Sequence, residues 1–149
     1  MLSKCIFSVK APAGPPVEII RHTFSPSQSA KPTQRVSLVT GLHGDELEGL
    51  YICHRLIETL KKLEEQNAVK GEVHIYPAVN PQALETGTRL WPFFSTDINR
   101  TFGEKNTRSL VTDASRTLLE DLKSNSDLVV DFHASNLHLM ELPQIRIIK

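Results

Sequence analysis

The chain has 149 residues, the length of one domain or of part of one. Lysine plus arginine and aspartate plus glutamate number 17 each, so the formal net charge of +0 gives no reason to expect a nucleic acid or an anionic membrane as partner. The two cysteines, Cys5 and Cys53, form no CxxC pair and no segment is as apolar as a membrane helix requires, which together predict a globular protein of the cytoplasm.

The first part of the chain predicts short strands separated by loops. Cys5–Val9 and Val17–His22 have the composition of strands and are separated by a segment rich in proline. Ser25–Gln34 is polar and holds two prolines, which predicts a loop. Arg35–Thr40 is a short β-branched run that predicts a buried strand, and a glycine ends it.

The middle of the chain predicts a helix, a strand and a long loop. Apolar residues recur at helical spacing from Glu46 to about Gln66, and His54 falls on their stripe, so we expect this histidine in the core. Val73–Val79 predicts the next strand. Asn80–Asn106 has no clear period, and a loop of that length inside a domain is usually functional or disordered.

The last part of the chain predicts a helix at Thr107–Lys123, a strand at Asp127–Phe132 and a further strand at Gln144–Ile148. Strands that alternate with helices predict an α/β layer fold with a largely parallel, mixed sheet flanked by helices. Because another element normally covers such a last strand, we expect residues 1–149 to be a single, partial domain that is truncated at its C-terminal end.

Two histidines and a glutamate are candidate zinc ligands. His43 and Glu46 form an H-x-x-E pair after the strand Arg35–Thr40, and His133 follows the strand Asp127–Phe132. The carboxyl ends of strands gather ligands in open α/β sheets, so the three side chains can converge there. Two histidines and one glutamate leave a coordination position open, as in catalytic zinc sites. The alternatives are a chance H-x-x-E pair and an ordinary buried histidine.

The long loop carries the other polar candidates. Arg89 lies within it, and Asn99 and Arg100 stand near its end. Guanidinium groups bind carboxylates and stabilise developing oxyanions, although ordinary solvated arginines are the alternative. Asp131 stands two residues before His133 and points to the same side of the strand. It is either a hydrogen-bond acceptor for that histidine or a buried structural carboxylate.

Taken together, the chain resembles the succinylglutamate desuccinylase/aspartoacylase family, relatives of the zinc carboxypeptidases, from about residue 35 to residue 135. Five segments carry the resemblance in this order: GLHGDELEG at 41–49, VNPQAL at 79–84, TR at 88–89, DINRTFG at 97–103 and VVDFHAS at 129–135. The resemblance implies a three-layer, zinc-carboxypeptidase-like α/β fold and a zinc-dependent deacylase that hydrolyses the amide bond of an N-acyl amino acid.

The resemblance also implies roles for individual residues. His43, Glu46 and His133 correspond to the three ligands of one Zn²⁺ per chain. Arg89 corresponds to the arginine that polarises the scissile carbonyl. Asn99 and Arg100 correspond to the pair that holds the free carboxylate of a small-molecule N-acyl amino acid.

One feature departs from the family pattern. The family uses a glutamate well downstream of its second zinc histidine as general base, but only sixteen residues follow His133, and Glu141 is the sole acid among them. We therefore expect the general base to be absent from this chain, which would then be an N-terminal fragment or a degenerate product. A zinc carboxypeptidase that acts on peptides and a non-catalytic zinc-binding fragment are the alternative functions.

Overall fold

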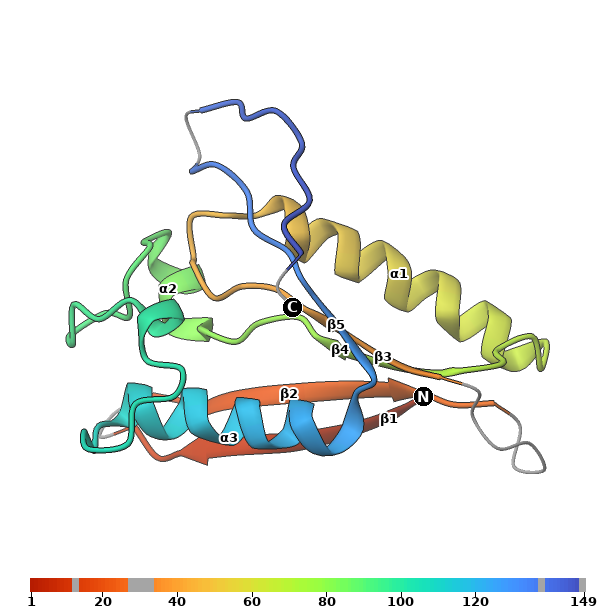
Figure 1. Ribbon diagram of the computed structural model, residues 1–149, viewed down its shortest axis with the longest axis horizontal. Coiled ribbons are helices and arrows are strands. Elements are labelled where there is room, and N and C mark those ends of the chain that lie inside the picture. The colour runs from red at the N-terminus through yellow and green to blue at the C-terminus, as the bar shows by residue number, and fades with distance from the viewer. Residues whose placement is uncertain (12–13, 27–33, 137–138, 148–149) are drawn as a thin grey trace.

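A computed structural model describes residues 1–11, 14–26, 34–136 and 139–147. Its centre is one mixed sheet in the strand order β1-β2-β4-β3-β5 (Figure 1). The strands are β1 (Leu2–Val9), β2 (Val17–Phe24), β3 (Arg35–Val39), β4 (Glu72–Tyr76) and β5 (Leu128–Asp131). β2 pairs antiparallel with β1 and with β4, whereas β3 pairs parallel with both β4 and β5. The parallel part of the sheet carries the candidate site.

Two long helices cover opposite faces of this sheet, α1 (Glu48–Glu65) and α3 (Leu110–Asn125). α3 begins at a capping box, in which the Ser109 side chain accepts from the Thr112 backbone and the Thr112 side chain accepts from the Ser109 backbone. Such reciprocal bonds satisfy backbone donors at the helix start, so the sequence fixes where α3 begins.

Each helix forms its own core with the sheet because successive side chains of a strand point to opposite faces. Val39 and Tyr76 face α3, and Leu38 and Ile75 face α1. The core under α3 is the larger one and includes Trp91 from the long loop. A helix, a sheet and a second helix therefore form three layers, which confirms the predicted α/β architecture.

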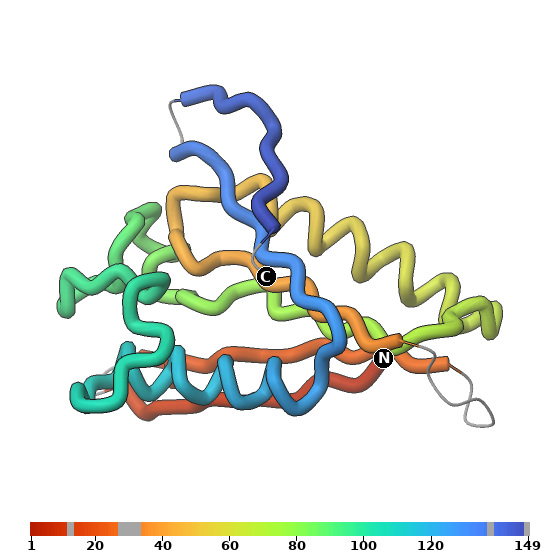
Figure 2. The backbone as a smooth tube through the Cα atoms, viewed as in Figure 1, coloured from red at the N-terminus to blue at the C-terminus, as the bar shows by residue number. Residues whose placement is uncertain are grey.

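The segment predicted as one long loop contains two short helices, α2 (Pro81–Thr86) and a 3₁₀ turn, η1 (Ile98–Arg100). Asn80 caps α2, because its side chain accepts a hydrogen bond from the Ala83 backbone N–H at 3.1 Å, and Pro81 occupies the first helical position. The Asn-Pro pair was thus a helix start signal. Figure 2 shows this segment running beside the end of the sheet.

Three further expectations differ from the structure. α1 begins at Glu48 and not at Glu46, and its His54 side chain is 67% exposed, so that histidine lies outside the core. No strand forms at 144–147, where Ile145 and Ile147 are exposed and no neighbouring strand offers backbone partners. Residue 148 of that predicted strand and residues 27–33 of the predicted loop lie outside the described residues. Among the described residues, no helix is both long and apolar enough to cross a membrane.

Candidate metal centre

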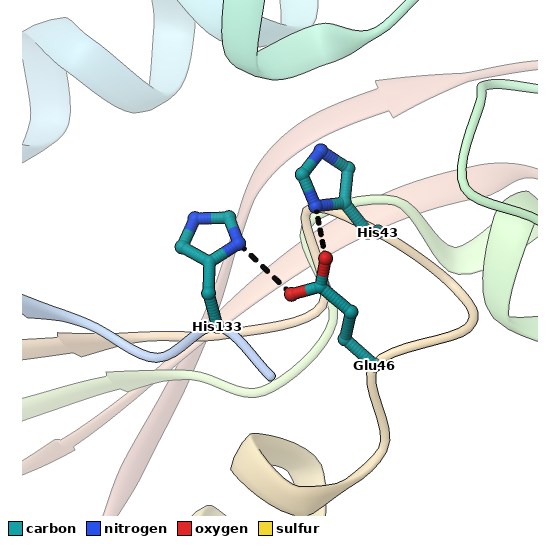
Figure 3. A group of neighbouring side chains, drawn as sticks. All are labelled: His43, Glu46 and His133. Atoms are coloured by element: carbon teal, nitrogen blue, oxygen red, sulfur yellow. Dashed lines mark hydrogen bonds and ion pairs between the residues drawn. The ribbon is translucent and has the colours of Figure 1, made fainter. Parts of the chain in front are cut away.

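The three candidate ligands come from two loops that leave neighbouring strands at the same edge of the sheet. His43 and Glu46 lie between β3 and α1, and His133 lies two residues after β5. β3 and β5 are adjacent and parallel, so their carboxyl ends lie side by side. Figure 3 shows the Glu46 carboxylate between the two imidazole rings.

The ligand atoms of these three residues converge. Nδ1 of His43 lies 2.7 Å from Oε1 of Glu46, and Nδ1 of His133 lies 3.0 Å from Oε2. The ring centroids are 5.0 Å apart, and one ligand atom from each residue lies within 4.8 Å of the others. Atoms that share a tetrahedral zinc are separated by about 3.3 Å, so small shifts would bring all three to one ion. Their role as zinc ligands stays a prediction.

Glycine allows the His43 loop to pass close to α2. A Cβ on Gly44 would lie 1.9 Å from the carbonyl oxygen of Ala83, which is closer than real side chains come to backbone. The Gly44 backbone N–H also donates to the carbonyl oxygen of Thr88 at 2.9 Å. Gly41 has a φ of +71°, a conformation that favours glycine. The β3–α1 loop is therefore held against the segment that carries Arg89.

A carboxylate lies beyond each histidine ring. Nε2 of His43 lies 3.0 Å from Oδ1 of Asp97, and Nε2 of His133 lies 2.9 Å from Oδ2 of Asp131. Asp97 also caps η1, because Oδ1 accepts from the Asn99 backbone N–H at 3.0 Å. No sequence pattern predicted a role for Asp97. It stands 54 residues from His43, and no local spacing signals that contact.

The structure brings Arg89 into the same cluster. One guanidinium nitrogen lies 3.0 Å from Oε1 of Glu46, and another lies 3.5 Å from Oδ2 of Asp97. The Arg89 side chain is 47% exposed, so it lies at the solvent side of the cluster. Asn99 and Arg100 belong to η1, directly after Asp97. Within the described residues, neither of their side chains makes a hydrogen bond or an ion pair, which leaves both available to a ligand.

The cluster shifts the pKa values of its members. Burial alone would raise the pKa of the Glu46 carboxyl, but the Ala134 backbone N–H and the two histidines outweigh it, so that pKa lies below its usual range. The pKa of Asp97 is likewise lowered, because its contacts with His43 and Asn99 overcome the effect of burial. The hydrogen bond to Asp131 raises the pKa of the His133 imidazole, against the opposing effect of burial.

The donor set fits a divalent cation. Each imidazole lies between two carboxylates, and the single N–H of a neutral ring satisfies only one of them. The surrounding charged groups are three carboxylates and one guanidinium, from Glu46, Asp97, Asp131 and Arg89. With neutral imidazoles the group carries an excess of two negative charges. A cation held at the two Nδ1 atoms and Glu46 would balance that charge and occupy the lone pairs that face the carboxylate.

Comparisons with known proteins show what this chain is similar to. Residues 32–147 match the model of the succinylglutamate desuccinylase/aspartoacylase catalytic domain. The N-alpha-acetyl-L-2,4-diaminobutyric acid deacetylase of Halomonas elongata is 30% identical over 106 residues, which cover 71% of this chain and 30% of that protein.

Solved structures show the same similarity. A succinylglutamate desuccinylase/aspartoacylase from Rhodobacter sphaeroides is 28% identical, with a TM-score of 0.65 over 81% of this chain and 34% of that one. The product-bound ectoine utilization protein EutE (DoeB) from Ruegeria pomeroyi is 26% identical, with a TM-score of 0.65 over 80% and 34%. A metallo-carboxypeptidase from Pseudomonas aeruginosa, 17% identical with a TM-score of 0.65 over 89% and 35%, shares the fold. The chain spans about a third of the length of these relatives.

Proposed function

The chain belongs to the succinylglutamate desuccinylase/aspartoacylase family, and we propose that its residues 1–149 are a partial catalytic domain with the zinc centre of an N-acyl amino acid deacylase. The observation that carries this proposal is the convergence of two Nδ1 atoms and one carboxylate at the carboxyl ends of β3 and β5. The reaction is hydrolysis of an amide bond, which yields a carboxylate and a free amino acid.

His43, Glu46 and His133 hold one zinc ion in this proposal. When bound, zinc supplies Lewis acidity and a water nucleophile at neutral pH. The chain's own contribution is to orient the two imidazoles and to keep their Nδ1 atoms directed at Glu46. The open side of the cluster, where Arg89 is half-exposed, is where we place the scissile amide.

Arg89 is the proposed stabiliser of the reacting carbonyl. Its guanidinium contacts Glu46 and Asp97, so it is already held beside the metal ligands. A bound substrate would take up the remaining donors of the guanidinium through the carbonyl oxygen that becomes negatively charged. Such stabilisation of an oxyanion by a positioned donor is typically worth about 3–4 kcal/mol.

Asn99 and Arg100 are the proposed binding pair for the free carboxylate of the substrate. The Asp97 side chain accepts the capping hydrogen bond from the Asn99 backbone N–H, so η1, which carries both residues, begins directly after a residue of the cluster. An arginine can bind a carboxylate through two parallel hydrogen bonds, and an asparagine amide adds one more donor. The substrate class is therefore a small N-acyl amino acid.

Neither aspartate that contacts a histidine of the cluster is free to act as general base. Asp97 and Asp131 are each bonded to a histidine ring, and Glu141 is exposed in the segment after the cluster. A general base typically contributes about 10²–10⁴-fold to the rate. We therefore expect this chain by itself to bind zinc and substrate while turning the substrate over slowly.

Deacylation is favoured over peptide cleavage by the relatives. The family match and the 30% identical Halomonas elongata deacetylase both indicate amide hydrolysis of small acylated compounds. The metallo-carboxypeptidase is 17% identical and supports the fold alone.

Binding experiments on the zinc-loaded chain test the proposal, because they do not depend on turnover. Calorimetry should detect an N-acetyl amino acid with a free carboxylate and should show weaker binding of its methyl ester. Arg100→Gln should weaken binding of the free acid by about tenfold or more, because it removes a charged hydrogen bond. Arg116→Gln, which removes an exposed arginine on α3, is the matched control and should bind as the wild type does. Binding of a tripeptide but not of any N-acyl amino acid would favour the carboxypeptidase alternative and contradict the proposal.

A further inference from the structure

We infer that Asp131 is a positioning residue for the metal centre, which selects the imidazole tautomer in which the Nδ1 lone pair of His133 faces Glu46. The inference deepens the proposed function and rests on the same zinc site. It assigns a role to Asp131 of β5. The sequence alone allowed this residue to be either a hydrogen-bond acceptor for His133 or a buried structural carboxylate.

The backbone fixes where Asp131 and His133 point. Asp131 is the last residue of β5 and is paired with Val39 of β3. The Phe132 backbone N–H donates to the carbonyl oxygen of Val39 at 2.9 Å, so the ladder continues past the strand. Residues two apart on an extended backbone point to the same side. Asp131 and His133 are therefore held side by side by the sheet itself.

The contact with Asp131 favours one of the two nitrogens of His133 as the site of the proton. Oδ2 of Asp131 lies 2.9 Å from Nε2, at the far end of the ring from Nδ1, which lies 3.0 Å from Oε2 of Glu46. A neutral imidazole has one N–H, and a carboxylate at Nε2 favours the proton there. Without that carboxylate, Glu46 alone would favour the proton on Nδ1, where the proton competes with a metal for the lone pair.

Asp131 is not a buried structural carboxylate. Its side chain is 38% exposed, and within the described residues His133 is its only side-chain partner. Asp97 has the corresponding contact with His43, but it also caps η1 and approaches Arg89, so its replacement would disturb the loop as well. Replacing Asp131 therefore changes what orients His133 without removing other side-chain contacts.

The experiment measures zinc affinity of the full 149-residue chain by competition with a chromophoric chelator. Loss of a group that hydrogen-bonds a metal-ligating histidine typically costs about 10–100-fold in metal affinity. We expect a loss in this range for Asp131→Ala and a smaller loss for Asp131→Asn, because the amide oxygen still accepts a hydrogen bond from Nε2. Asp113→Asn is the matched control, since it removes an exposed aspartate on α3 and should leave zinc affinity unchanged.

A spectroscopic readout separates positioning from general damage. In the zinc-loaded wild type labelled with ¹⁵N-histidine, NMR should detect His133 with the proton on Nε2 and the metal on Nδ1. The signal of that N–H should persist in Asp131→Asn and should disappear by solvent exchange in Asp131→Ala. Asp131→Asn keeps the shape of the side chain, so its zinc affinity and His133 N–H signal can be measured even if Asp131→Ala does not fold.

The outcomes distinguish the inference from the function on which it rests. Wild-type zinc affinity in a folded Asp131→Ala variant would overturn the positioning role and leave the zinc site standing. An unchanged His133 N–H signal in that variant would overturn it as well. A folded wild type that binds no zinc would overturn the proposed centre, and the role of Asp131 with it.

Discussion

The Glu46 side chain makes the most polar contacts in the cluster. Its two carboxylate oxygens lie within 3.0 Å of four nitrogens, which belong to His43, His133, Arg89 and the Ala134 backbone. These contacts hold a negative charge in a buried place, where an unpaired carboxylate would be strongly disfavoured. The same charge is what a cation at the two Nδ1 atoms would bind.

Glu46→Gln should therefore abolish tight zinc binding. The amide keeps the shape of the side chain but is a neutral and poor metal ligand, so we expect zinc affinity to fall by at least about 100-fold, beyond the usual effect of groups that only hydrogen-bond a ligand. Chelator competition measures the change, with Glu58→Gln on the exposed side of α1 as control. Equal affinities in wild type and Glu46→Gln would place the metal elsewhere.

His74 of β4 makes a separate prediction about pH. It is 1% exposed, and burial lowers its pKa against the opposing charge of Glu72. In the unfolded chain, His74 takes up a proton as the pH falls through about 6.5, whereas in the folded chain it does so only at a lower pH. The free energy of unfolding should therefore fall as the pH drops through this value.

Urea unfolding between pH 5 and 8 measures this dependence. His74→Gln should have a flatter stability profile than the wild type on the acid side, whereas His54→Gln, at an exposed histidine of α1, should keep the wild-type slope. A wild-type slope in His74→Gln would assign the pH dependence to other groups.

At the scale of elements, the site depends on the contact between the β3–α1 loop and α2. Gly44→Ala should destabilise the chain by about 3 kcal/mol or more, because the added methyl group meets the Ala83 backbone, which cannot move away as a side chain can. Gly87→Ala is the matched comparison. Its Cβ would meet nothing within 4 Å, so only its φ of +60° is strained, at a cost of about 1–2 kcal/mol.

Urea unfolding of both metal-free variants checks this order of stabilities. Gly44→Ala should also bind zinc more weakly than Gly87→Ala, since it displaces the loop that carries His43. If Gly44→Ala were the more stable of the two, the close approach of loop and α2 would not exist in solution.

Local sequence signals predicted the elements that hold the site, but not the contacts between them. The β-branched run before Gly41 and the apolar run before His133 predicted strands ahead of the two loops that carry the candidate ligands, and the structure confirms both strands. Helical periodicity wrongly predicted that His54 lies in the core. Periodicity identifies an apolar stripe on a helix but does not say which part of that stripe the sheet covers. The contact between His43 and Asp97 depends on how η1 packs, and nothing local encodes it.

At the scale of the molecule, one edge of the sheet exposes apolar surface. β5 is the edge strand, and its Leu128 and Val129 are 48% and 43% exposed, although parallel strands are usually covered on both faces. Large apolar side chains are also exposed in the segment after the cluster, at Leu139, Met140, Leu142, Ile145 and Ile147. Exposed edge strands and large apolar patches favour association between chains.

We therefore predict that the 149-residue chain self-associates. Sedimentation velocity over a range of concentrations should show a rising average mass, and Val129→Lys should reduce it, since a lysine on an edge strand opposes pairing. Thr59→Lys, at an exposed position of α1, is the matched control and should associate as the wild type does. A single monomeric species at every concentration would show that these surfaces do not mediate association.

The most direct test of the central claim is the zinc content of the purified chain, measured by elemental analysis beside a His43→Ala/His133→Ala variant. The arrangement of Nδ1 atoms around Glu46 predicts about one zinc per chain, lost in the variant. A folded wild type with no more zinc than the variant would contradict the metal centre and leave the chain with the fold of its family but not the zinc site.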